Sequence, residues 1–350
     1  MISFYPGPSQ LYPQIRDFML EAVDSGILSV NHRSDAYISM AGATIASMKR
    51  VLRIPDEYQV YFVSSATECW EIIAQSLILD KGSVHLYNGA FGRKWYEYTA
   101  RLSKNCRFIA FDPEEEAPFP EGDLGEMVCV THNETSNATQ LSMEYARALR
   151  KRYPDTLIAV DATSSMAGCD LDFEQADIWF ASAQKCFGLP AGLAVMVCSP
   201  RAIERAKAIG EEKHYNSLLF IDSMARKTQT THTPNVLNIF LLGKIMEIVP
   251  EIHVTAERLR SRKRRINDFF ENQTPFSRLI KNRAVQSDTV LCFNADKVQL
   301  KELKKKAASQ GLLLGNGYGP WADNSFRIAN FPAIQDQDYD KLTRFIKNFS

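Results

Sequence analysis

The sequence has no excess charge of either sign and no long apolar run. Lys and Arg together number 41, Asp and Glu also number 41, and the formal net charge is therefore zero. A nucleic-acid partner is not expected, because binding to a polyanion depends on an excess of positive charge. No apolar run reaches the roughly 18 residues that span a bilayer, and the first residues show neither the charged nor the apolar segment of an export signal. We therefore expect a cytoplasmic protein that binds neither nucleic acid nor membranes.

Cysteine is also sparse: the chain has seven cysteines and no C-x-x-C pair. This pattern predicts a reduced protein without a cysteine metal site. His132 has no second ligand at a helical or hairpin offset, so no metal is expected there either. Cys186 directly follows Lys185, but no histidine lies close enough in sequence to activate its thiol. Packing is therefore favoured over a nucleophilic role for Cys186.

Two short stretches could suggest a nucleic-acid or nucleotide ligand. Residues 258–265 read R-L-R-S-R-K-R-R and continue a helical pattern, which predicts a solvated helix face. Gly315, Gly317 and Gly319 form G-x-G-x-G, but no helix opens after them. A flexible turn is therefore the better interpretation of these glycines.

The order of apolar and helical segments predicts an α/β fold. Short apolar runs alternate with helical patterns up to about residue 200, which indicates βαβ units and a mainly parallel sheet. Residues 215–232 lack a regular period and are interpreted as a mobile or inter-subunit loop, followed by a long helix kinked at Pro250. We expect an N-terminal arm over 1–15, a large domain over 16–250 and a smaller α+β domain over 251–350, which also takes up part of the N-terminal segment.

An acid and an amine stand at the ends of two predicted strands. The apolar run 156–160 ends in Asp161, and the run 178–183 ends in Gln184 and Lys185. Ligands of open α/β sheets bind beyond such carboxyl ends. The pair suits pyridoxal phosphate, because a lysine amine can bind its aldehyde while a carboxylate keeps its ring nitrogen protonated. Taken alone, however, strand-terminal Asp and Lys are more often a capping aspartate and a surface lysine.

Other polar segments are candidates for the same site. The S-S-A-T stretch at 64–67 leads from a strand into a helix, which fits either a phosphate site or a plain N-cap. His32 and Arg33 form a polar pair that suits an anion or an exposed turn. Phe91 follows a strand and could lie on a planar cofactor, although core packing is commoner for an aromatic residue. Arg327 interrupts an apolar strand pattern, and a substrate carboxylate would give it a partner.

Together these segments resemble the class V aminotransferase family of fold-type I pyridoxal-phosphate enzymes, and within it the phosphoserine aminotransferases. The resemblance covers nearly the whole chain. It is carried by F-Y-P-G-P-S at 4–9, N-H-R-S at 31–34, S-S-A-T at 64–67, H-N-E-T-S at 132–136, V-D-A at 160–162, S-A-Q-K-C-F-G-L-P-A-G-L from 182, H-T-P at 232–234 and F-R-I-A-N-F-P-A from 326.

The resemblance implies a role for each matching residue. Lys185 would form the Schiff base and shuttle protons, and Asp161 would pair with the pyridinium nitrogen. A homodimer with shared active sites is implied, in which His232 and Thr233 reach the cofactor phosphate of the neighbouring subunit. The remaining assignments are Ala66, Thr67 and Gln184 at the cofactor phosphate, Phe91 on the ring, Thr135 at its 3-hydroxyl, His32 and Arg33 at the substrate phosphate, and Arg327 at the substrate α-carboxylate.

The resemblance also implies a reaction in serine biosynthesis, in which glutamate and 3-phosphohydroxypyruvate give phosphoserine and 2-oxoglutarate. Many members carry a second His-Arg pair shortly before the carboxylate arginine. Here residues 317–325 read G-Y-G-P-W-A-D-N-S and contain no positive charge. An aminotransferase that takes alanine or serine with glyoxylate therefore stays open as an alternative, as does a non-catalytic protein that binds pyridoxal phosphate.

Overall fold

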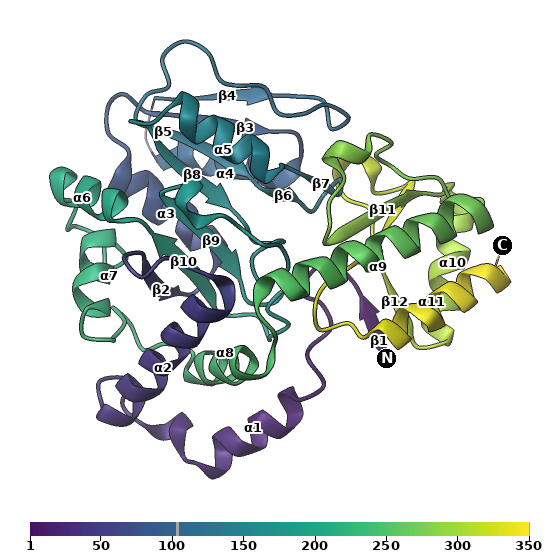
Figure 1. Ribbon diagram of the computed structural model, residues 1–350, viewed down its shortest axis with the longest axis horizontal. Coiled ribbons are helices and arrows are strands. Elements are labelled where there is room, and N and C mark those ends of the chain that lie inside the picture. Colours follow the sequence, from purple (N-terminus) through teal and green to yellow (C-terminus); the bar gives the residue numbers. More distant parts are fainter. Residues whose placement is uncertain (103–104, 350) are drawn as a thin grey trace.

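The computed structural model describes residues 1–102 and 105–349, in which the two larger of three sheets lie side by side with helices around them (Figure 1). The larger sheet has seven strands in the order β2-β10-β9-β8-β5-β3-β4. Only β10 runs antiparallel to its neighbours, so the expected α/β fold with a mainly parallel sheet is confirmed. The strands are β2 (Gln59–Val63), β3 (Ser83–Tyr87), β4 (Cys106–Ala110), β5 (Met127–Thr131), β8 (Leu157–Asp161), β9 (Ile178–Ser182) and β10 (Ala194–Cys198).

Both faces of the large sheet are buried, which explains why its strands are apolar throughout. In β5, Met127 and Cys129 pack into one hydrophobic core, whereas Val128 and Val130 pack into the other. Side chains alternate along a strand, so a strand covered on both faces needs apolar residues at successive positions. One core includes helices α3 (Ala66–Leu77), α4 (Ala90–Leu102), α6 (Pro200–Ile209) and α7 (Leu218–Ala225), and the other includes α1 (Ile15–Asp24), α2 (Asp35–Leu52), α5 (Met143–Arg152) and α8 (Val236–Ile248).

The smaller sheet combines the start of the chain with its end. Its order is β1-β12-β13-β11, and β1 (Ile2–Phe4) pairs in parallel with β12 (Leu312–Asn316). Both termini consequently lie beside this sheet (Figure 1). The other strands are β11 (Val290–Asn294) and β13 (Ser325–Ala329), and the surrounding helices are α9 (Ile252–Gln273), α10 (Lys297–Ser309) and α11 (Asp336–Phe349). The proposed domain boundaries at residues 15 and 250 stay a prediction.

Two expectations about the helical segments were wrong. Residues 215–232 contain α7, which carries the buried residues Leu218 and Ile221. Helix α7 is short and mostly apolar, so its sequence shows no amphipathic period. Pro250 does not kink one long helix, because α8 ends at Ile248 and α9 begins at Ile252. A proline has no N–H to donate and excludes the helical conformation of its predecessor, which separates the two helices.

Most basic side chains of the run 258–265 are exposed, as expected for a solvated helix face, but Arg262 is buried and Lys263 is half-buried. The Arg262 side chain is 1% exposed, and its Nε donates to Asp336 at 2.7 Å. Lys263 Nζ lies 2.7 Å from an oxygen of Asp288. Arg258 donates to the carbonyl of Pro332 at 3.2 Å. These contacts attach α9 to the segment before β11 and to the segment after β13. Sequence periodicity alone cannot locate such distant partners.

The glycine triplet is not a simple flexible turn. Gly315 lies within β12, where an added Cβ would stand 2.5 Å from Pro6 Cδ. At Gly317 an added Cβ would stand 2.1 Å from the Trp321 carbonyl oxygen. Gly315 therefore permits close packing against the N-terminal arm, and Gly317 against the backbone of Trp321. No helix within the described ranges has the length and apolar character needed to cross a membrane.

Candidate functional site

Neighbouring strand ends of the large sheet place Asp161 and Lys185 in one cavity. Thr131 at the end of β5 pairs with Asp161 at the end of β8, and Asp161 pairs with Phe180 of β9. Lys185 follows three residues after Ser182, where β9 ends. Since the three strands are parallel, their carboxyl ends meet at one edge of the sheet. Asp161 and Lys185 line the same cavity there, with a volume of about 240 Å³.

The cavity collects every cofactor residue that was assigned within a single subunit. Its lining includes residues from strand ends and from the starts of α3 and α4. The predicted residues present are Ala66, Thr67, Phe91, Thr135, Asp161, Gln184 and Lys185. The remaining lining residues had no role predicted from the sequence; they are Trp70, Lys94, Tyr98, Thr131, Asn133, Thr163 and Ser182.

The Lys185 amine is shielded from water by the N-terminal arm. Lys185 is 9% exposed. Burial, and after it the positive charge of Arg327, lowers the pKa of the Lys185 amine to about 8. An added Cβ at Gly7 would stand 2.5 Å from Lys185 Cε, so the glycine lets the arm pack directly on the lysine. The Ser9 N–H donates to the Gln184 carbonyl at 3.2 Å. A lysine with this pKa is partly neutral near physiological pH, as a nucleophile or proton acceptor must be.

Asp161 is a buried carboxylate that would be stabilised by a cation. Burial raises its pKa, against the effect of hydrogen bonds from Thr163, whose N–H donates to Oδ1 at 2.9 Å. The nearby negative charge of Glu134 raises the pKa further. None of the ion pairs among the described residues includes Asp161. A protonated ring nitrogen beside this carboxylate would therefore be favourable for both groups.

Further polar groups in the lining fit a phosphorylated, polar cofactor. Two buried oxygens, Thr131 Oγ1 and Asn133 Oδ1, have no hydrogen-bond partner within residues 1–102 and 105–349. Ser65 caps α3 by accepting from the Glu68 N–H at 3.1 Å, so the N-cap interpretation is correct for this residue. The same helix start still reaches the cavity through Ala66 and Thr67. A helix N-terminus attracts phosphate, and these residues together fit pyridoxal phosphate.

Glu134 holds Phe91 in place and was missed in the sequence. Its Oε2 accepts from the backbone N–H groups of Phe91 and Gly92 at 3.0 and 3.1 Å. Its Oε1 accepts from the Ser136 N–H and hydroxyl at 2.9 and 2.6 Å. The carboxylate therefore satisfies the first turn of α4 and orients the aromatic ring at the cavity. The only sequence signal was an acid inside the polar run 131–136.

A Glu134→Gln variant tests this positioning role. The amide keeps one acceptor oxygen, so it can no longer accept from both α4 and Ser136. We expect cofactor binding to weaken about tenfold, because charge-assisted bonds to the helix start are lost. The dissociation constant of pyridoxal phosphate, followed by absorbance, measures the effect. Glu97→Gln is the control, since Glu97 lies on the same helix and pairs with exposed Arg93. Equal affinities in the two variants would contradict the role of Glu134.

Arg327 is a buried cation held by backbone oxygens. Arg327 is 4% exposed. Its Nε donates to the Asn316 carbonyl at 2.6 Å, and its Nη1 donates to the Thr135 carbonyl at 2.8 Å. Burial lowers the pKa of Arg327, which shows that the charge is poorly solvated. In the described part of the chain no carboxylate forms an ion pair with it. The guanidinium is therefore oriented and still available to an anionic ligand.

Five predicted site residues do not line the Lys185 cavity of their own chain. Arg327 adjoins it through the carbonyl of the lining residue Thr135, whereas the other four lie elsewhere. His32 and Arg33 lie in the turn before α2, and His232 and Thr233 lie before α8. His32 lies close to both Arg33 and His232. Burial, followed by the positive charges of these two neighbours, lowers the pKa of His32. His232 instead contributes to a cavity beside α2 and β2. Within one chain the fold thus separates these four residues from Lys185.

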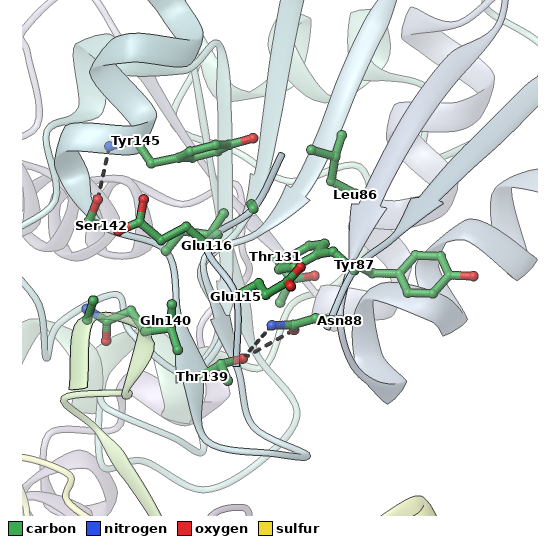
Figure 2. Close-up of a pocket in the computed structure, with 15 residues that line it drawn as sticks. Leu86, Tyr87, Asn88, Glu115, Glu116, Thr131, Thr139, Gln140, Ser142 and Tyr145 are labelled. Carbon is green, nitrogen blue, oxygen red and sulfur yellow. Dashed lines mark hydrogen bonds between the residues drawn. The ribbon is translucent and has the colours of Figure 1, made fainter. Parts of the chain in front are cut away.

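A second cavity lies next to the site but is too small for a cofactor. Figure 2 shows Asn88 hydrogen-bonded to Thr139, with Gln140 and Tyr145 on the other side of the pocket. Thr131 lines both cavities. The free space measures about 20 Å³, which is enough for roughly one water molecule. Among the described residues, no group of three or more His, Cys, Asp or Glu side chains is arranged to hold a metal ion.

Comparisons with known proteins agree with this geometry. Residues 4–319 match the family model of class V aminotransferases. A phosphoserine aminotransferase of Rhodococcus opacus is 27% identical and covers 97% of this chain and 92% of its own length. The crystal structure of a phosphoserine aminotransferase from Cytophaga hutchinsonii superposes with a TM-score of 0.94 at 33% identity, covering 99% of this chain and 98% of that one.

A more distant structure shares the fold alone. The alanine–glyoxylate aminotransferase of Nostoc sp. superposes with a TM-score of 0.82 at 17% identity, covering 100% of this chain and 95% of that one. Its similarity bears on the arrangement of the elements, not on the substrate. With the family model, the full-length relatives and the cavity in agreement, the chain belongs to the class V aminotransferase family and is a pyridoxal-phosphate-dependent aminotransferase.

Proposed function

We propose that the protein is a cytoplasmic phosphoserine aminotransferase, which transfers the amino group of glutamate to 3-phosphohydroxypyruvate in serine biosynthesis. The observation that carries the proposal is the cavity lined by Lys185, Asp161 and Phe91. Beside it, Arg327 is held by the carbonyl of the lining residue Thr135, and its charge acts on Lys185. The names of the full-length relatives support the choice of substrate. The seven free cysteines fit a reducing compartment.

The residues in and beside the cavity have different roles in the proposed reaction. Pyridoxal phosphate, when bound, supplies an aldehyde for the amine and a ring that takes up the electron pair left on the substrate carbon. Arg327 binds the substrate α-carboxylate and orients the α-carbon. Lys185 Nζ, in the neutral form that its lowered pKa makes more abundant, accepts the α-proton and holds it for return. Asp161 keeps a negative charge against the ring nitrogen, and the arm at Gly7 limits access of water.

We further propose a homodimer in which each subunit completes the site of its partner. His32, Arg33, His232 and Thr233 lie outside the cavity of their own chain, so the cofactor and substrate roles proposed for them need a second copy. Exposed apolar side chains on α1, Leu20 at 54% and Val23 at 62%, offer a surface that a second subunit could cover. In this arrangement His32 and Arg33 would bind the phosphate of the substrate.

One observation favours a second candidate function. Residues 317–325 have no positive charge, so the protein is also a candidate for an aminotransferase that takes alanine or serine with glyoxylate. The substrate test compares single half-reactions of the holoenzyme with phosphoserine, serine and alanine as donors, followed by the cofactor spectrum. We expect kcat/KM for phosphoserine to exceed that for serine by about 100-fold, because two or three charge-assisted bonds bind its phosphate. Equal values would reject the phosphorylated substrate while leaving aminotransferase activity intact.

A further inference from the structure

Residues 317–325 contain no positively charged side chain, but a lysine of another element lies against them. Lys94 of α4 donates from Nζ to the Tyr318 hydroxyl at 2.7 Å. Lys94 stands one helical turn after Phe91, and both line the Lys185 cavity. The lysine side chain is exposed, so its ammonium group lies at the rim of the cavity. A cation therefore stands against residues 317–325, although their own sequence contains none.

Phe91 and Tyr318 form an aromatic pair that three cations approach. The ring centroids of the pair are 5.2 Å apart, and Lys94 Nζ lies 5.6 Å from the first and 5.3 Å from the second. Lys185 Nζ lies 5.6 Å from the Phe91 centroid. The Arg327 guanidinium lies 5.5 Å from the Tyr318 centroid. A small substrate held by Arg327 and reacting at Lys185 consequently has its far end within reach of Lys94.

The hydrogen bond between Lys94 and Tyr318 leaves donors available. The ammonium has three N–H groups and uses one on Tyr318. The Tyr318 oxygen accepts that bond, so its own O–H remains able to donate. In residues 1–102 and 105–349 no ion pair includes Lys94, whereas its neighbour Arg93 is paired with Glu97 at 2.8 Å. Two donors thus face the cavity rim without a competing acid, which suits an anion.

We propose that Lys94 and Tyr318 select substrates that carry a second anionic group, a phosphate or a carboxylate, beyond the α-carboxylate. The proposal rests on the proposed aminotransferase function and adds two residues to its substrate pocket. Lys94 supplies from α4 the positive charge that residues 317–325 lack. The Tyr318 hydroxyl positions the ammonium and donates to the same group. Amino acids with neutral side chains, such as alanine and serine, gain nothing from either residue.

Binding of an unreactive probe tests the pair without catalysis. 3-Phosphoglycerate carries both anionic groups but has no amino or keto group, and glycerate lacks the phosphate. We expect Lys94→Met to weaken binding of 3-phosphoglycerate to the holoenzyme about tenfold in calorimetry, with glycerate unchanged. Tyr318→Phe should weaken it less, and Lys94→Arg should preserve most of the affinity. Arg93→Gln is the matched control, because it removes one charge from the same helix outside the cavity lining.

Single half-reactions with different amino donors test the same two residues during catalysis. Lys94→Met should lower kcat/KM about tenfold for phosphoserine and glutamate but less than twofold for alanine. Equal losses for all three donors, or weaker binding of glycerate as well, would assign Lys94 a general packing role and overturn the proposal. Unchanged binding of 3-phosphoglycerate would overturn it too. If wild-type protein transaminates no donor, the proposed function fails by itself, and the calorimetric comparison still decides the role of Lys94.

Discussion

Replacement of Lys185 by Ala is expected to abolish amino transfer and the yellow colour of the purified protein. Lys185 is the buried amine of the cavity, and it would serve both as the attachment point of pyridoxal phosphate and as the acceptor of the α-proton. Loss of both roles should reduce kcat by about 10⁴-fold or more. Single-turnover kinetics and borohydride trapping of the cofactor, followed by mass spectrometry, provide the measurement.

The control for this variant is Lys207→Ala, which removes an exposed lysine from α6. It should retain the colour and activity of the wild-type protein. If Lys185→Ala still transaminates at a comparable rate, the catalytic assignment is wrong. If wild-type protein stays colourless after incubation with pyridoxal phosphate, a non-catalytic role for the fold gains support.

The pH dependence of cofactor attachment tests the same amine. Burial disfavours the protonated form of Lys185 and lowers its pKa to about 8. Below pH 8 the amine is mostly protonated and cannot attack the aldehyde, and above pH 8 it is mostly neutral. The rate of attachment should therefore rise with pH and level off above about 8, whereas an exposed lysine would need about pH 10.4. A midpoint near the latter value would show that the amine is not buried as described.

Heterodimers built from two inactive variants are expected to recover about half of the wild-type activity if the sites are shared. In a dimer of Lys185→Ala and Arg33→Ala subunits, one site would contain both substitutions. The other site would combine Lys185 of one chain with Arg33 of the other and would be intact. Co-expression with two different tags isolates the heterodimer, and phosphoserine turnover measures its activity against each parent homodimer.

The matched control pairs Lys185→Ala with Arg327→Ala. Arg327 accompanies Lys185 in its own chain, where its charge affects the lysine pKa, so no site of this heterodimer is intact. Activity should stay near the level of the parent homodimers. Recovery in the control, or none in the Arg33 pair, would contradict shared sites. A monomer in analytical ultracentrifugation would do so as well, because His32 and Arg33 could then reach no Lys185 cavity.

Local patterns in the sequence were sufficient for much of the large sheet. Helix α2, for example, is marked by local signals alone, because Ser34 caps its start and an apolar stripe continues to its end. In contrast, the strand at Cys106–Ala110 was not predicted, because three of its five residues are exposed and it lies at the edge of the sheet. Strand β1 was also missed, since its three residues form a strand only by pairing with β12, more than 300 positions away.

The α/β fold and the residues most directly suited to the chemistry follow from local patterns in the sequence. Asp161, Lys185 and the start of α3 could be found because each is marked by a local change from apolar to polar residues at a strand end. The groups that surround these residues, in contrast, come together only when the chain folds. Glu134 under Phe91, Gly7 against Lys185 and Lys94 at Tyr318 join residues that are distant along the chain. Burial and charge act through such spatial neighbours, so the lowered pKa of Lys185 and the available charge of Arg327 appear only once the chain is folded.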